Sequence, residues 1–163
     1  MKRFLCICLL FAMCFSSNAM ALTVPVPQVG DVIEFGRYEQ DNVLDNGKEP
    51  IEWIVLEVQD DKAWLMSKYC LEVVIFYPQR VKMYWGISDL RTWMNGDFIQ
   101  EAFSAEEQAL IQTTTVKNDN PHGLRGAGED TLDQVYLLSK SEVLHFMPEL
   151  EDRIAYPTEY AKA

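Results

Sequence analysis

The segment "IEWIVLEV", Ile51 to Val58, constrains the fold of this chain most strongly, because it is apolar on both sides when it is drawn as a strand. Side chains alternate between the two faces of a strand. One face carries Ile51, Trp53 and Val55, and the other carries Ile54, Leu56 and Val58. Such a strand is typical of the interior of a sheet that is covered on both sides. The polar "QDDK" that follows predicts a tight turn, and "AWLMSKY" predicts the hairpin partner.

Strands and short helices are mixed along the rest of the chain without regular βαβ alternation. We expect further strands at "DVIEFGRYEQ", "TTTVK" and "QVYLLS", and an irregular course with short strands from Val73 to Tyr84. Ser139 or Ser141 is a suitable N-cap for a short helix at "EVLHFM", and Thr158 can cap a last helix. This mixture predicts an α+β fold.

The stretch "LRTWMNGDFIQEAFSAEEQALI", Leu90 to Ile111, predicts three short helices. Ser88 is a suitable N-cap for the first, and the apolar residues Leu90, Trp93 and Met94 follow at helical spacing. The pair Asn95-Gly96 predicts the end of that helix, because both residue types tolerate the left-handed conformation. Asp97 is then expected to cap a second helix whose inward side carries Phe98, Ile99, Ala102 and Phe103. "SAEE", Ser104 to Glu107, matches a capping box and predicts a third helix that runs to Ile111.

The N-terminus has the pattern of a secretory signal. Lys2 and Arg3 precede an apolar run from Phe4 to Phe15, and Ala19-Met20-Ala21 forms a small-x-small cleavage site. The run is too short to cross a membrane, which takes about 20 apolar residues. Two alternatives are a retained anchor helix and a lipoprotein attached at Cys14. We expect cleavage after Ala21, which divides the chain into a signal peptide (1–21), an extended leader (22–29) and a single domain (30–163) that is secreted or otherwise extracytoplasmic.

The net charge and the positions of the cysteines bear on which partners and which chemistry this chain can have. The chain has 14 basic and 25 acidic residues and a net charge of −11, which disfavours binding to nucleic acid and to anionic lipid surfaces. Cleavage after Ala21 would leave Cys70 as the one cysteine, so we expect no internal disulfide. Cys70 stands in the apolar stretch "KYCLEVVIF". A buried, inert thiol fits that setting, and a nucleophile is the alternative.

Motifs for the common enzyme chemistries are absent from the sequence. The two histidines, His122 and His145, belong to no zinc or hydrolase motif, and there is no phosphate-binding loop. The loop from Asn118 to Asp133 is rich in acidic residues and glycine, a composition that suits calcium on a flexible backbone. Its spacing does not match an EF-hand, and a solvated acidic loop is the alternative reading.

Four segments in order, "FGRYEQDN", "NGKEPIEWIVLEV", "LRTWMNGDFIQEAFSAEEQALI" and "DQVYLLSKSEV", resemble the bacterial DUF6273 family, a domain of unknown function typical of secreted and surface proteins. The resemblance covers roughly Gly30 to Ala163. It implies a relation to the formylglycine-generating enzyme and to C-type-lectin-like folds, and thus an irregular α+β domain with small twisted antiparallel sheets and short flanking helices. Such family members continue past "YAKA" into a segment rich in Gly and Trp, so the domain is expected to be incomplete at its C-terminus.

Arg91, Trp93 and Asn95 lie in the most recognisable of these segments. In one interpretation they line a ligand groove, where Trp93 stacks on a sugar and Arg91 pairs with a carboxylate. In the other, Trp93 is part of the core, Arg91 anchors an acidic side chain and Asn95 closes the helix. The lectin-like resemblance favours a non-enzymatic domain that recognises a glycan or cell-wall component. The alternatives are an enzyme or enzyme remnant of the formylglycine-generating type and a structural module of a larger surface protein.

Overall fold

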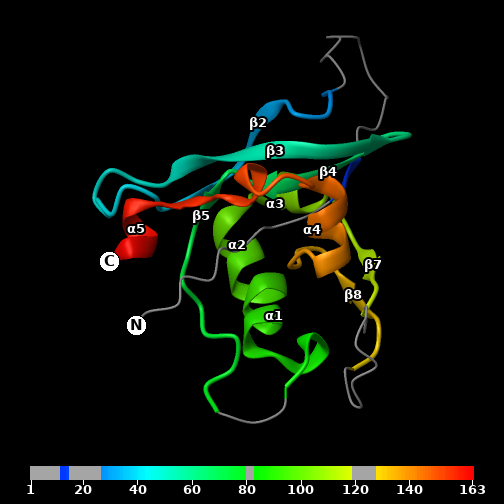
Figure 1. The fold of residues 1–163 in the computed structure, drawn as a ribbon. Helices are drawn as coiled ribbons and strands as arrows, with labels where there is room; N and C mark the ends of the chain where they lie inside the picture. Colours follow the sequence, from blue (N-terminus) through cyan, green and yellow to red (C-terminus); the bar gives the residue numbers. More distant parts are fainter. Residues whose placement is uncertain (1–11, 15–26, 80–82, 119–127) are drawn as a thin grey trace.

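A five-stranded sheet forms the centre of the computed structural model, which describes residues 12–14, 27–79, 83–118 and 128–163. Its strand order is β2-β3-β4-β1-β6, and every neighbouring pair is antiparallel. The strands are β2 (Val32–Tyr38), β3 (Glu49–Gln59), β4 (Lys62–Ser67), β1 (Ala12–Cys14) and β6 (Ile111–Gln112). The helices α1 and α2 lie below this sheet in Figure 1.

The β3–β4 hairpin confirms the strand and turn predicted around Ile51 to Val58. A tight turn joins the two strands, and Asp60 takes the left-handed conformation there, with φ at 54°. Ile51, Trp53 and Val55 are completely or almost completely buried on one face of β3. Ile54 and Leu56 on the opposite face are half-buried, and a bulge between Val55 and Glu57 turns the half-buried Val58 to the core side, opposite Ala63. β3 is therefore an interior strand by pairing, but only one of its faces is fully covered.

The helical stretch after Ser88 is continuous, and the predicted break at Asn95-Gly96 is wrong. α1 (Asp89–Trp93) passes into a π-helical turn, η2 (Met94–Phe98), and then into α2 (Ile99–Ala102). The Asn95 amide donates to the carbonyl of Arg91 and to that of Val135, so a neighbouring segment holds Asn95 inside the helix. Ser88 caps α1 as predicted.

The core lies between the sheet and this helical stretch. Trp53 packs near Phe103, with ring centroids 6.3 Å apart, and its indole N–H donates to the Phe35 carbonyl at 2.6 Å. Of the predicted inward positions, Trp93 is half-buried and the others are buried: Leu90, Met94, Phe98, Ile99, Ala102 and Phe103. The helical face therefore stabilises the sheet through apolar burial.

Capping residues set the starts of the remaining helices. The capping box at Ser104 is confirmed, but α3 (Ala105–Gln108) ends before Ile111, which begins β6. Ser139, rather than Ser141, caps α4 (Lys140–Phe146), and Thr158 caps α5 (Glu159–Lys162). Two short 3-10 helices complete the helical elements of the described residues, η1 (Trp85–Ile87) and η3 (Glu151–Arg153).

Two small strand pairs flank the central sheet. β7 (Thr114–Val116), predicted at "TTTVK", pairs antiparallel with β8 (Thr131–Asp133). The strand predicted at "QVYLLS" is wrong, because the pairing falls just before it and only Tyr136 forms an isolated bridge. β5 (Tyr69–Cys70) pairs with β9 (Tyr156–Pro157) in parallel. Small, mainly antiparallel sheets with short helices confirm the predicted α+β class, and no helix among the described residues is long and apolar enough to cross a membrane.

The N-terminal segment contributes β1 to the sheet, and Cys70 is disulfide-bonded. The expectation of an unpaired Cys70 applies to the chain after cleavage, where it stays a prediction. It assumed removal of the signal segment, which holds the other cysteines of the sequence, Cys6, Cys8 and Cys14. Apart from β1, the expected signal peptide lies outside the described residues, as does the leader up to residue 26.

Candidate ligand pocket

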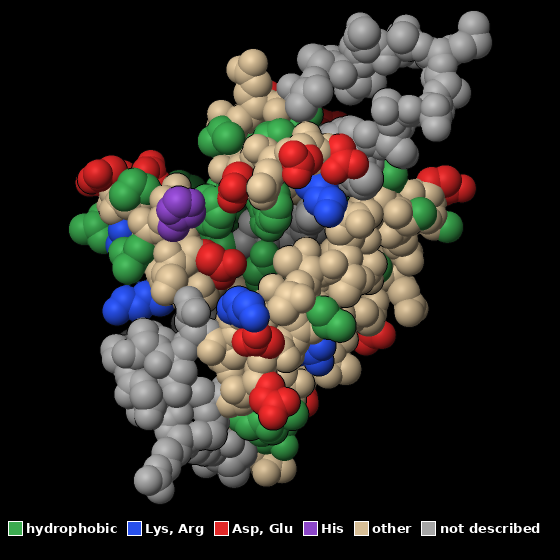
Figure 2. Space-filling view, turned by 90° about the vertical axis from the view of Figure 1, so that its right-hand side faces the viewer, with side chains coloured by type: hydrophobic (Ala, Val, Ile, Leu, Met, Phe, Trp, Pro, Cys, Tyr) green, Lys and Arg blue, Asp and Glu red, His purple; other side chains and the backbone are tan. Residues whose placement is uncertain are grey.

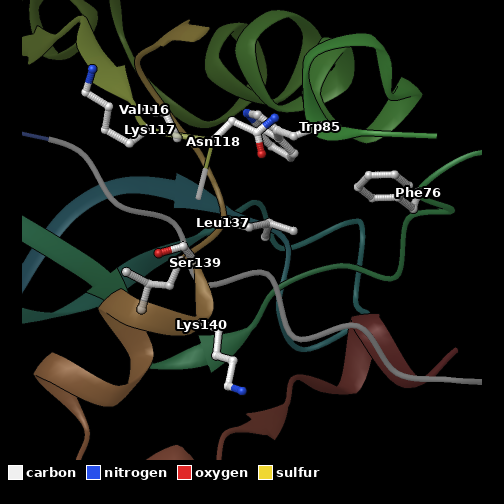
Figure 3. Close-up of a pocket in the computed structure, with 9 residues that line it drawn as sticks. Phe76, Trp85, Val116, Lys117, Asn118, Leu137, Ser139 and Lys140 are labelled. Atoms are coloured by element: carbon white, nitrogen blue, oxygen red, sulfur yellow. The ribbon is translucent and has the colours of Figure 1, made fainter. Parts of the chain in front are cut away.

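A cavity of about 250 Å³ opens between η1, the end of β7 and the start of α4. Aromatic and aliphatic side chains share its wall with amide, hydroxyl and ammonium groups (Figure 3). The lining residues are Phe76, Trp85, Val116, Lys117, Asn118, Leu137, Leu138, Ser139 and Lys140. An apolar wall with a few polar groups is the usual composition of a small-ligand site.

A buried carboxylate fixes the orientation of the Trp85 ring at this cavity. The Trp85 indole N–H donates to Asp133 Oδ2 at 2.8 Å. Asp133 is 1% exposed and also accepts hydrogen bonds from Arg91 Nε at 2.7 Å and from the Thr131 hydroxyl at 2.6 Å. A buried carboxylate that is paired and fully hydrogen-bonded holds its neighbours in one geometry. The Trp85 ring is therefore held in one orientation at the wall of the cavity.

The polar wall of the cavity is partly occupied by internal bonds. Lys117 forms an ion pair with Asp130, with 2.6 Å between Nζ and Oδ2, and this pairing holds the pKa of Asp130 below its ordinary value. The Ser139 hydroxyl accepts from the backbone of α4 as its N-cap. Lys140 is exposed and forms no ion pair within the described part of the chain. Its ammonium group can meet a ligand without first breaking a salt bridge.

The residues predicted to bind a ligand, Arg91, Trp93 and Asn95, do not line this cavity, and all three make internal contacts. Besides Asp133, the Arg91 guanidinium donates to the carbonyls of Gly86 and Leu132. Asn95 accepts from the backbone N–H groups at positions 134 and 135. Trp93 packs on Phe98 with ring centroids 5.3 Å apart. These contacts match the structural interpretation, and the ligand-binding role of the three residues stays a prediction.

Sequence reasoning did not single out the residues that build the pocket. Phe76 falls in the stretch that was expected to be irregular, and Trp85 directly follows it. Leu137 lies in the strand predicted at "QVYLLS". The three positions lie in separate segments of the sequence and come together only through the fold. The sequence signal that could have indicated the pocket is an aromatic side chain, Phe76, in an apolar stretch without regular periodicity.

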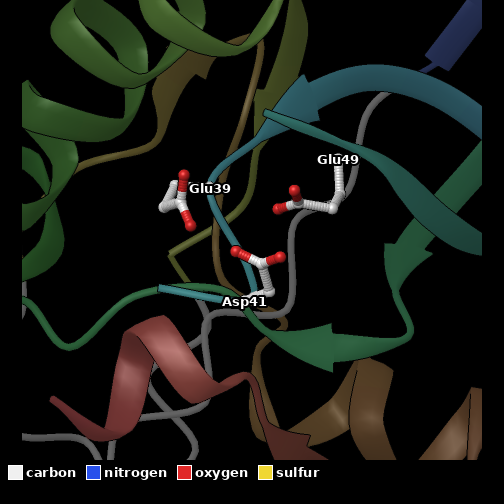
Figure 4. Close-up of side chains that lie close together, drawn as sticks. All are labelled: Glu39, Asp41 and Glu49. Atoms are coloured by element: carbon white, nitrogen blue, oxygen red, sulfur yellow. The ribbon is translucent and has the colours of Figure 1, made fainter. Parts of the chain in front are cut away.

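A second cluster of polar groups lies where β2 leads into the turn before β3. The carboxylates of Glu39, Asp41 and Glu49 point toward one another (Figure 4), and their nearest oxygens all lie within 4.8 Å. Burial, and then the charge of Glu49, raises the pKa of Glu39 above its ordinary value. The backbone N–H of Val43 donates to both Glu39 and Asp41. Three carboxylates at this spacing could hold a cation such as calcium.

The acidic loop from Asn118 to Asp133, whose composition suits calcium, is described only at residues 118 and 128–133. Asp119 and His122 lie outside the described residues. Asp130 and Asp133 are engaged in the internal bonds given above. His145 is exposed and packs against Phe146, with ring centroids 4.8 Å apart. On the face shown in Figure 2, acidic side chains are widely spread and basic ones lie between them.

Comparison with known proteins links the pocket to a family. The model of a family described as a domain of unknown function (DUF6273) matches residues 60–162. No curated protein and no solved structure matches the chain. All the pocket residues fall inside the matched range, whereas Glu39, Asp41 and Glu49 precede it.

Proposed function

The chain belongs to the DUF6273 family of domains of unknown function, and from the pocket within the matched residues we propose that it is an extracytoplasmic, non-enzymatic domain that binds a glycan or cell-wall component. The observation that carries this proposal is the Trp85 ring, held by buried Asp133 at the wall of a cavity that also presents polar groups. Sugars present apolar C–H faces and hydroxyl edges, which suit an aromatic plane beside hydrogen-bonding groups.

Two features of the sequence support this proposal, one for the location of the protein and one for the class of its ligand. The N-terminal sequence has the basic start, apolar run and small-x-small site of an export signal. The acidic balance of the chain disfavours nucleic acid as a partner and is compatible with neutral sugars. Lys140 adds one accessible cation at the pocket, which favours a glycan that carries a carboxylate.

The enzyme alternative gains no support from the described residues. Chemistry of the formylglycine-generating type would need a reactive cysteine. Cys70 is 4% exposed, and a reactive thiol is instead partly exposed and ionised. Binding is therefore the function that the geometry supports best.

The test is a titration of the protein with neutral oligosaccharides and with soluble peptidoglycan fragments, followed by intrinsic tryptophan fluorescence and calorimetry. We expect saturable binding that Trp85→Ala abolishes and that Lys140→Gln weakens about tenfold, which corresponds to about 1.4 kcal/mol. Lys162→Gln is the matched control, because Lys162 is a cation on α5 that pairs with Glu159 and does not line the pocket. This variant should bind like the unchanged protein.

Trp85→Phe separates ring stacking from support of the fold. It keeps an aromatic face and removes the N–H that donates to Asp133. We expect weaker binding than in the unchanged protein and stronger binding than in Trp85→Ala. If the unchanged protein melts cooperatively and binds none of the sugars, the proposal is wrong.

A further inference from the structure

β1 occupies an interior position in the sheet although it belongs to the expected signal segment. Ala12 and Met13 pair antiparallel with Trp64 and Ala63 of β4 on one side. The same two residues pair antiparallel with residues 112 and 111 of β6 on the other. β4 and β6 therefore run in the same direction, one strand width apart on either side of β1. Neighbouring strands are spaced about 4.8 Å, so the gap that β1 fills is about 10 Å wide.

Cleavage after Ala21 would separate β1 from the rest of the chain. β4 would then have a partner only in β3, and the backbone groups that β4 and β6 direct toward β1 would lose their hydrogen bonds. Unpaired strand edges are ready templates for another strand. Ala63 is completely buried and Ile111 is 4% exposed beside this gap, so an apolar surface would open together with the free edges.

We infer that the gap between Lys62–Trp64 and Ile111–Gln112, the β1 slot, is a binding site for an extended apolar segment of another polypeptide once the signal segment has been removed. The inference rests on the expected cleavage and is independent of the Trp85 pocket. The segment seated in the slot shows the chemistry of the occupant: it is short, uncharged and drawn from the apolar run Phe4 to Phe15. A guest strand would pair antiparallel to both neighbours, which is recognition by β-augmentation.

Two other occupants fit the slot less well. The leader after the cleavage site contains Pro25 and Pro27, which have no backbone N–H to donate and are disfavoured in interior strands. A second copy of the chain would bring together two molecules of strongly negative charge, which repel each other. Both remain distinguishable outcomes of the test below.

The test uses the full chain with a protease recognition sequence inserted between Ala21 and Leu22. The protein is kept under reducing conditions, so that the disulfide of Cys70 does not hold the excised segment in place. After cutting and removal of that segment, a fluorescent peptide with the sequence of Leu9 to Ser16, carrying Cys14→Ser, is titrated by anisotropy. We expect saturable binding. Hydrogen exchange should show that the peptide restores protection to the amides of β4 and β6.

Matched proline substitutions control the specificity of pairing. A peptide with Met13→Pro should bind at least about tenfold more weakly, because it lacks a ladder donor. In the protein, Gln112→Pro in β6 should weaken peptide binding, whereas Thr115→Pro in β7 should not, because β7 pairs with β8 away from the slot.

Four results would overturn the inference. The first three are the absence of saturable binding, dimers of the cut chain that exclude the peptide, and full protection of β4 and β6 without peptide, which would place the leader in the slot. The fourth is a cut chain that has lost its cooperative melt and does not recover it when the peptide is added.

Discussion

Arg91 Nε lies 2.7 Å from Asp133 Oδ1, and the side chain of Asp133 has no exposed area while that of Arg91 is 27% exposed. The pair joins α1 to the end of β8. Since Asp133 also accepts the indole N–H of Trp85, the same carboxylate links the helix, the small β7–β8 sheet and the pocket wall. Arg91 thus helps to position the Trp85 ring through a carboxylate that both residues share.

Replacement of the buried Asp133 carboxylate should lower the free energy of unfolding. Asp133→Asn leaves the Arg91 charge without its partner, and breaking one side of a buried pair typically costs about 3 kcal/mol. We expect a loss of that size in the free energy of unfolding, measured by urea denaturation. Glu159→Gln, which removes the exposed pair with Lys162, should cost less than about 1 kcal/mol. Equal losses in the two variants would contradict the role of burial.

Asn95→Ala should lower stability and leave ligand binding intact. The substitution removes the two acceptor and two donor contacts that join η2 to residues 91, 134 and 135. Leaving a buried backbone N–H or carbonyl group without a hydrogen-bond partner lowers the free energy of unfolding by about 2 kcal/mol. Thermal melts and sugar titrations of the same variant separate the two interpretations of this residue. Unchanged stability with lost binding would favour the ligand-groove interpretation.

Two glycines should respond in opposite directions to alanine. Gly96 has helical backbone, and an added Cβ would meet nothing within 4 Å, so Gly96→Ala should stabilise the chain by about 0.5–1 kcal/mol. Gly36 has φ at +72°, and an added Cβ would lie 2.5 Å from the Phe103 ring. Gly36→Ala should therefore destabilise the chain. The midpoint of urea denaturation measures the stability of both variants. A shift of the two midpoints in the same direction would contradict the prediction.

The carboxylate cluster should make stability depend on pH. Because the pKa of Glu39 is raised in the folded chain, first by burial and then by the charge of Glu49, the folded chain holds this proton more tightly than the unfolded chain does. The ionised form therefore opposes folding at neutral pH, and that penalty declines as the pH falls through the raised pKa to the ordinary value. Glu39→Gln should raise the unfolding free energy at pH 7 and have little effect below the ordinary pKa of glutamate.

Asp45→Asn is the control for this pH dependence, because Asp45 is exposed on the same turn. Urea midpoints at pH 4 and pH 7 measure both variants. A Glu39→Gln variant that is less stable at pH 7 than the unchanged protein would indicate that the carboxylate charge is favourable, for example through a bound cation.

Local sequence signals predicted the elements whose causes are local. The β3–β4 hairpin follows from alternation and a polar turn, and the caps at Ser104, Ser139 and Thr158 follow from hydroxyl side chains that accept nearby backbone N–H groups. The error at Asn95-Gly96 has a tertiary cause. The partners of Asn95 lie about 40 residues further along the chain, and they retain it in a helix that its own sequence would end.

Elements that depend on distant partners were predicted less well. β7 and β8 are three residues each, and their pairing, rather than the apolar run of "QVYLLS", sets the position of β8. The pocket joins Phe76, Trp85 and Leu137 from three separate segments. No single window of sequence contains that combination. The ligand-binding role of Arg91, Trp93 and Asn95 and the cleavage after Ala21 stay predictions, and Asn95→Ala tests the first of them at Asn95.

The π-helical turn at Met94–Phe98 gives the continuous helix two angular phases. Each residue of an α-helix advances about 100° around its axis, and a π turn holds one residue more than an α turn. In a uniform α-helix Ile99 and Phe103 would point away from the side that carries Leu90 and Met94, and the extra residue of η2 brings them back to that side. The length of this turn thus determines which side of α2 meets the core. A single-residue deletion within η2 should therefore be tolerated better than a single-residue deletion in α1.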